Sequence, residues 1–137
     1  MKSKLLFTGL VVIALLVMTA CSRPMSQASV DESDSGKQVE IWANGGLLTV
    51  TLESNQTTGY SWELKEISDP SVLQKTDSKY ETPTSGLVGA GGKEVWTYKA
   101  LKAGTTTLSM EYSQPWEGGQ KDAKSFTLTV VVKYLAK

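Results

Sequence analysis

Few residues in this chain of 137 could perform covalent chemistry. It contains no histidine, so the commonest general base and the commonest transition-metal ligand are both missing. The single cysteine, Cys21, can form neither a disulfide within the chain nor a cysteine-rich zinc site. Carboxylates remain, and Glu53 or Glu117 could act with Asp122 as the acid and base of a glycosidase. No pocket-forming insertion accompanies these acids, so we expect no enzyme activity, no metal site and no cofactor.

A small polar pentapeptide, Asn55-Gln56-Thr57-Thr58-Gly59, separates two stretches that have the pattern of β-strands. None of its side chains is a strong nucleophile, base or metal ligand. Thr57 and Thr58 are β-branched and therefore stiff at χ1, while Gly59 allows a positive φ and a close approach of the backbone. These properties indicate a loop that acts by fitting into a partner, as an inhibitory or recognition loop does.

The elements that must position this loop are strands, because apolar and polar residues alternate with period two from residue 39 onward. The clearest runs are 48–52, 96–100, 106–112 and 126–134, and shorter segments lie at 39–42, 62–67 and 72–80. Turn residues separate these roughly seven strands. The spacing predicts an all-β, immunoglobulin-like antiparallel β-sandwich without a disulfide, with a closed barrel as the alternative.

The aromatic residues divide between this core and the loops. Trp62, Trp96 and Phe126 fall on alternating positions, and we expect them to be buried. Each alternating run, up to Tyr134 in the last one, should present one buried face. Trp116 lies in a loop rich in proline and glycine, outside any alternation, and we expect it to contact a partner. Tyr60 could serve either purpose.

The first residues are typical of an exported protein. Lys2 and Lys4 precede an apolar run, 5–18, that is shorter than the roughly 20 residues of a membrane-spanning helix and has the layout of a secretory signal. It ends in Val17-Met18-Thr19-Ala20-Cys21, which resembles the lipobox of bacterial lipoproteins. This resemblance implies a signal peptide over 1–20 and an acylated Cys21. The alternatives are an ordinary signal peptide cleaved nearby and an uncleaved anchor.

The lipobox implies a protein that is lipid-anchored in the cell envelope. Ser22 after the cysteine favours the outer membrane if the cell has two. Residues 21–38 are rich in serine, aspartate and glycine, so we expect the acylated cysteine to be followed by a flexible, disordered tether and the folded domain to occupy 39–137. The N-glycosylation sequon at Asn55-Gln56-Thr57 is accidental if the protein is bacterial.

The net charge of the chain does not favour binding to a polyanion such as a nucleic acid. The chain has 14 basic and 14 acidic residues, and Lys2 and Lys4 belong to the first twenty, so the remainder is slightly acidic. A surface of this kind lacks the basic footprint that nucleic acids or anionic membranes attract. We therefore expect a soluble globular domain that does not bind nucleic acid. Independently of charge, we expect it to be a monomer.

Three stretches in order carry a family resemblance: the pentapeptide with its following Tyr60-Ser61-Trp62, then Gly89-Ala90-Gly91-Gly92, then Gln114-Pro115-Trp116. They resemble the motifs Asn-Pro-Thr-Thr-Gly, Gly-x-Gly-Gly and Arg-Pro-Trp or Arg-Pro-Phe of the chagasin family, which are protein inhibitors of papain-like cysteine proteases. The similarity covers about 39–137. A single Gly-x-Gly-Gly would say little, but three motifs in order at matching strand positions are specific.

The resemblance implies reversible, non-covalent occlusion of a protease cleft by three loops. The pentapeptide would enter centrally, with Thr57 and Thr58 nearest the catalytic pair, and the other two motifs would flank it, with Trp116 as the aromatic anchor. Gln56 replaces the family's proline and Gln114 its arginine, which should loosen the turn and remove a charge-assisted contact. The alternative is a membrane-tethered sandwich that binds a peptide, a glycan or an assembly partner.

Overall fold

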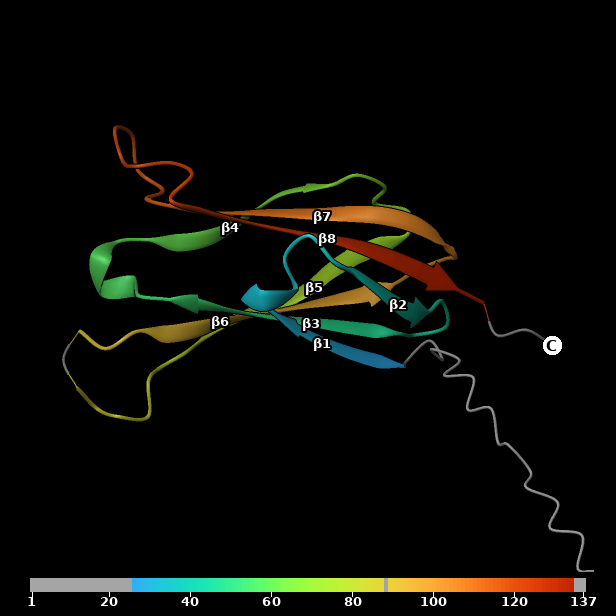
Figure 1. Cartoon of the computed structure of the whole chain (residues 1–137), viewed down its shortest axis with the longest axis horizontal. Helices are drawn as coiled ribbons and strands as arrows, with labels where there is room; N and C mark the ends of the chain where they lie inside the picture. The colour runs from blue at the N-terminus through green and yellow to red at the C-terminus, as the bar shows by residue number, and fades with distance from the viewer. Residues whose placement is uncertain (1–25, 88, 135–137) are drawn as a thin grey trace, which may run out of the picture.

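Two four-stranded sheets pack face to face in the computed structural model, which describes residues 26–87 and 89–134 (Figure 1). One sheet has the order β1-β3-β6-β5 and the other β2-β8-β7-β4. The strands are β1 Gln27–Asp31, β2 Gln38–Trp42, β3 Leu47–Ser54, β4 Ser61–Ile67, β5 Leu73–Glu81, β6 Gly92–Ala100, β7 Gly104–Ser113 and β8 Lys124–Lys133, with 3-10 turns η1 Glu32–Asp34 and η2 Gln56–Thr58. The predicted all-β sandwich is confirmed, with one strand more than expected. The alternative of a closed barrel is wrong.

The additional strand is β1, and it corrects the predicted tether. β1 pairs in parallel with β3, and its Ala28 and Val30 are buried in the core. The chain then crosses through η1 to the other sheet, where β2 pairs in parallel with β8. Residues 27–38 are therefore folded, and the prediction of disorder there is wrong. The five-residue strand was not predicted because its only apolar residues, Ala28 and Val30, are small and lie in a sequence rich in serine and aspartate. The signal peptide and Cys21 lie outside the described residues.

The remaining pairings are antiparallel, and their alternating residues form the core as predicted. Trp62, Trp96 and Phe126 are all buried, which confirms their assignment to the core. Tyr134 does not continue the buried face of β8, since the strand ends at Lys133 and this tyrosine is 62% exposed. The pairing of β8 with β7 stops at Val132 and its pairing with β2 at Lys133, so neither partner strand extends to Tyr134.

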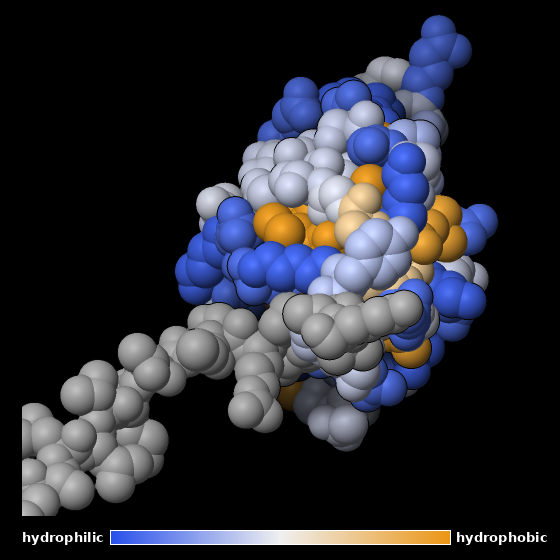
Figure 2. Space-filling view, turned by 90° about the vertical axis from the view of Figure 1, so that its right-hand side faces the viewer, coloured by the Kyte–Doolittle hydropathy of each residue, from blue (hydrophilic) through white to orange (hydrophobic). Residues whose placement is uncertain are grey.

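Antiparallel order brings three connections to one end of the sandwich: β3 to β4, β5 to β6 and β7 to β8 (Figure 1). β1 begins at the opposite end, because it runs parallel to β3 and Gln27 pairs with Leu47. Figure 2 looks onto that opposite end, where hydrophobic surface lies among polar residues. Leu101, in the turn between β6 and β7, is 44% exposed there. Among the described residues, no helix has the length and apolar character needed to cross a membrane.

Candidate functional site

The central loop, residues 55–59, is closed by its own hydrogen bonds. The Asn55 side chain caps η2, because its Oδ1 accepts from the Thr57 amide at 3.2 Å and from Thr57 Oγ1 at 2.6 Å. Thr58 Oγ1 donates to the Asn55 carbonyl at 2.6 Å. Gly59 ends the turn with φ +81°, as its sequence context predicted. These bonds hold the turn in shape although its first residue, the exposed Gln56, lacks the constraint of a proline ring.

Asn55 also connects the central loop to its neighbours. Its Nδ2 donates to the Gly89 carbonyl at 3.0 Å, and its backbone amide donates to Tyr112 Oη at 2.9 Å. Tyr112 in turn stacks on Tyr60, with ring centroids 5.3 Å apart. Sequence reasoning missed Tyr112, although it stands near the end of an alternating strand and two residues before the third motif.

The second predicted stretch belongs to the Gly-rich loop, which we define as residues 82–87 and 89–91. Gly89 has φ +80°, and the Ala90 amide donates to the Leu87 carbonyl at 3.2 Å. Gly92, predicted as part of this loop, is the first residue of β6. A Cβ at Gly92 would lie 2.6 Å from Cζ of Tyr80, so a side chain does not fit there. Gly91 approaches the central loop, where its added Cβ would meet that of Asn55 at 3.8 Å.

The third predicted stretch opens the Trp loop, residues 114–123. Gln114 donates through Nε2 to the Thr58 carbonyl at 3.4 Å, and its Oε1 accepts from the Gln120 amide at 2.9 Å. Gln114 therefore links the Trp loop to the central loop, which is a role that its replacement of an arginine did not suggest. Tyr60 Oη makes a further link by donating to the side chain of Gln120.

Trp116 lies at the junction of these two loops. Its side chain is 50% exposed, as predicted, and the covered part packs against Gly59. Pro115 is exposed beside it. The Trp116 carbonyl accepts from the Gly119 amide at 3.1 Å, which closes the tip of the loop. The exposed part of the indole thus points away from the fold and is available to a partner.

The end of the Trp loop is held by a carboxylate. Asp122 has φ +53°, and its amide donates to Glu111 Oε1 at 3.0 Å. This hydrogen bond, and then the Lys65 ammonium 3.4 Å away, lower the pKa of the Glu111 carboxyl from its ordinary value. Glu111 therefore stays charged and keeps the unusual backbone of Asp122 in place.

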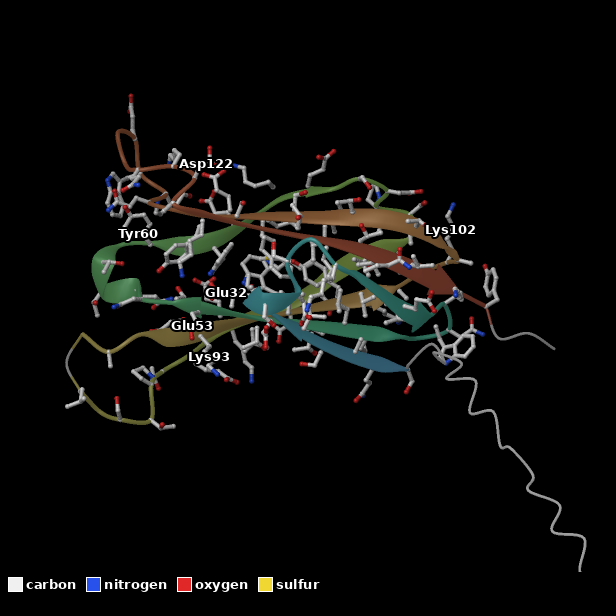
Figure 3. The ribbon with its side chains drawn as sticks, viewed as in Figure 1. Glu32, Glu53, Tyr60, Lys93, Lys102 and Asp122 are labelled. Carbon is white, nitrogen blue, oxygen red and sulfur yellow. The ribbon has the colours of Figure 1, made fainter. Side chains whose placement is uncertain are left out.

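The acids considered for glycosidase chemistry do not form a buried pair, because Glu117 and Asp122 are exposed in the Trp loop and Glu53 is exposed on β3. Figure 3 shows Asp122 above the sheet that contains β7, and Glu53 on the other sheet beside Lys93. Glu53 and Lys93 help to line a cleft of about 290 Å³ behind the central loop, together with Ser54, Asn55, Gly91, Gly92, Tyr112 and Lys124. In the part of the chain that the structure describes, no three histidine, cysteine, aspartate or glutamate side chains are grouped to hold a metal ion.

Sequence comparisons agree with this geometry. The sequence model described as "Chagasin family peptidase inhibitor I42" matches residues 42–130. The chain is 37% identical over 103 residues to chagasin of Trypanosoma cruzi, covering 72% of this chain and 92% of that protein. It is 37% identical over 87 residues to amoebiasin-2 of Entamoeba histolytica, covering 64% and 71% respectively.

Solved structures show the same fold. The crystal structure of the cysteine protease inhibitor EhICP2 from Entamoeba histolytica superposes with a TM-score of 0.66 at 27% identity, over 78% of this chain and 97% of that one. PbICP-C, solved in complex with falcipain-2, has a TM-score of 0.55 at 19% identity, over 82% and 93%. The second comparison shows similarity of fold alone.

Proposed function

The chain belongs to the chagasin family of peptidase inhibitors, and from this premise we propose that it is a reversible, non-covalent inhibitor of papain-like cysteine proteases. The observation that carries the proposal is the arrangement of the three motifs at one end of the sandwich. Asn55 joins the central loop to the Gly-rich loop, and Gln114 joins it to the Trp loop. The three loops therefore present one preformed surface, with the central loop between two flanks.

The mechanism is occlusion of the protease cleft. The central loop enters between the cleft walls, with Thr57 and Thr58 nearest the catalytic cysteine and histidine. Its turn is closed by the Asn55 cap and by the amide of Gly59, which donates to the Gln56 carbonyl at 3.1 Å. A turn held in this way does not extend along the cleft as a substrate must, so no peptide bond is aligned for attack. It also loses little conformational entropy on binding.

The flanking loops supply contacts on either side of the cleft. The motif residues proposed to contact the protease are Asn55, Gln56, Thr57, Thr58, Gly59, Gly89, Ala90, Gly91, Gly92, Gln114, Pro115 and Trp116. Trp116 is the strongest of them, because a half-exposed indole beside a proline offers a large rigid surface at small entropic cost. Gly92, the first residue of β6, has no side chain and would contribute through its backbone alone.

Titration against papain tests this proposal. The purified protein should block hydrolysis of a fluorogenic peptide in a one-to-one ratio, activity should return on dilution, and the recovered inhibitor should be intact by mass spectrometry. Trypsin, a serine protease, is the control and should be unaffected. Absence of papain inhibition at micromolar concentration, or cleavage within residues 55–59, would overturn the proposed function.

We also propose that the inhibitor is a monomeric lipoprotein, anchored through acylated Cys21 to the envelope membrane, the outer one where the cell has two. The support is the sequence Val17-Met18-Thr19-Ala20-Cys21 that follows a basic and apolar leader. Mass spectrometry of the membrane fraction should find a mature chain that starts at Cys21 and carries acyl groups. A Cys21→Ala variant should lack them. A mature chain without lipid would disprove the anchor and leave the inhibitor proposal intact.

A further inference from the structure

Glu94, on β6, is a buried carboxylate that none of the three motifs includes. Its side chain is 8% exposed. Its Oε1 accepts two hydrogen bonds, one from Ser54 Oγ at 2.6 Å and one from the Trp62 amide at 3.1 Å. Ser54 is the last residue of β3 and Trp62 the second residue of β4, so they lie on either side of the central loop. One carboxylate oxygen therefore joins the two ends of this loop.

The strands that flank the central loop do not fix its ends by themselves. β3 and β4 belong to different sheets, so no ladder of backbone hydrogen bonds joins them. In an ordinary hairpin that ladder sets the separation of the two ends of the loop. Here Glu94 bridges the sheets at this point, and the indole of Trp62 adds a second link by donating through Nε1 to the Glu53 carbonyl at 3.0 Å.

Fold stability alone does not favour a carboxylate at this place. Along β6, the inward positions that follow Glu94 are occupied by Trp96, Tyr98 and Ala100, all buried. A carboxylate at an inward position is costly to bury unless it is hydrogen-bonded, and an apolar side chain of similar size would avoid that cost. The two hydrogen bonds that Glu94 accepts from the ends of the loop offset the cost of burying it.

We propose that Glu94 is a positioning residue of the inhibitor: it sets the separation and orientation of the two ends of the central loop, and through them the place of Thr57 and Thr58 in the protease cleft. The role in inhibition rests on the function proposed above. Glu94 does not touch the protease, because it is buried beneath the loop. Its effect on the loop itself exists in the free protein and can be measured there.

Two substitutions separate the hydrogen bonds from the volume of the side chain. Glu94→Gln keeps an oxygen that can accept both bonds, and the inhibition constant for papain should stay within about threefold of wild type. Glu94→Leu fills the site but accepts neither bond, and the inhibition constant should rise about tenfold or more. Ser54→Ala removes one of the two donors and should give a smaller rise in the same direction. The Ser54→Ala variant also tests the proposal if Glu94→Leu does not fold.

Two further measurements distinguish positioning from general destabilisation and from failure of the proposed function. Val50→Ala removes core volume in β3 away from the loop, and it should lower the melting temperature without raising the inhibition constant at 25 °C. Amide hydrogen exchange at residues 55–59 of the free protein should be faster in Glu94→Leu than in Val50→Ala. Unchanged exchange there would overturn the role of Glu94, whether or not wild type inhibits papain. Equal loss of inhibition in Glu94→Leu and Val50→Ala would also overturn it.

Discussion

The indole of Trp116 packs directly on Gly59, so that the Trp loop and the central loop share one surface. A Cβ at Gly59 would lie 2.8 Å from Cζ3 of Trp116, closer than real Cβ atoms approach, and Gly59 also has φ +81°. Glycine is therefore required here twice, for the conformation of the backbone and for the space that the indole occupies. The first and third motifs therefore form one structural unit at this contact.

Replacement of Gly59 by valine should consequently damage inhibition more than stability. The side chain would displace the exposed indole of Trp116 and force a β-branched residue into the left-handed region, which costs about 1–2 kcal/mol. We expect the inhibition constant for papain to rise by more than that strain explains. Gly45→Val is the control, because Gly45 has φ +76° with open space around it and lies outside the three loops, so it should lose stability without losing inhibition. Equal losses of binding and of unfolding free energy in Gly59→Val would make Gly59 only a turn residue.

Trp116→Ala should weaken binding to the protease by about 2 kcal/mol or more, which is roughly a 30-fold rise in the inhibition constant. The side chain is half exposed, so the melting temperature should change little. Tyr134→Ala removes an exposed aromatic residue outside the three loops and should not affect inhibition. A folded Trp116→Ala variant with wild-type inhibition would show that the anchor lies elsewhere.

Two substitutions of Asn55 should separate its roles. Asn55→Asp keeps an oxygen for the Thr57 amide but loses the donor to the Gly89 carbonyl, so the central turn should persist while the Gly-rich loop becomes mobile. Asn55→Ala loses both functions and should cost about 1 kcal/mol of stability from the cap alone. Hydrogen exchange at Thr57 and Ala90 reports the two loops separately. Equal effects of both variants on Thr57 would contradict the assignment of the cap to Oδ1.

The Glu111–Asp122 contact makes the Trp loop sensitive to acid. The pKa of Glu111 is lowered in the folded protein, first by the Asp122 amide and then by Lys65. A lowered folded pKa stabilises the protein above the ordinary carboxyl range, and this stability is lost as pH falls through the lowered value. Melting temperatures from pH 7 to pH 3 should therefore fall less for Glu111→Gln than for wild type. Parallel curves would exclude this contribution.

Alternation in the sequence was sufficient to predict the sandwich, because long antiparallel strands with one buried face produce a strong period-two signal. It failed at β1, where Ala28 and Val30 are the only apolar residues and the partner, β3, lies beyond another strand in the chain. It also failed at Tyr134, where the alternation continues past the end of the partner strand. The alternation within one segment does not show which other strand pairs with that segment.

The candidate site was also predicted only in part from the sequence. The three motifs could be identified because, taken together and in order, they resemble those of a known family. The residues that join them cannot be identified in this way, since nothing in the sequence indicates that Gln114 binds the Thr58 carbonyl. Glu94 occupies an inward position of an alternating strand, and that mismatch was the available signal. Its two partners lie 40 and 32 residues earlier, so only the fold could reveal them.

The folded β1 limits where an anchored inhibitor can act. With an acyl chain on Cys21, only residues 22–26 separate the bilayer from the sandwich, and five residues extend at most about 18 Å. β1 begins at the end opposite the three loops. The length of the rigid sandwich, rather than that of a flexible tether, would therefore set the distance between the membrane and the protease-binding loops. If Cys21 is acylated, the inhibitor would therefore reach only proteases that come close to the membrane surface.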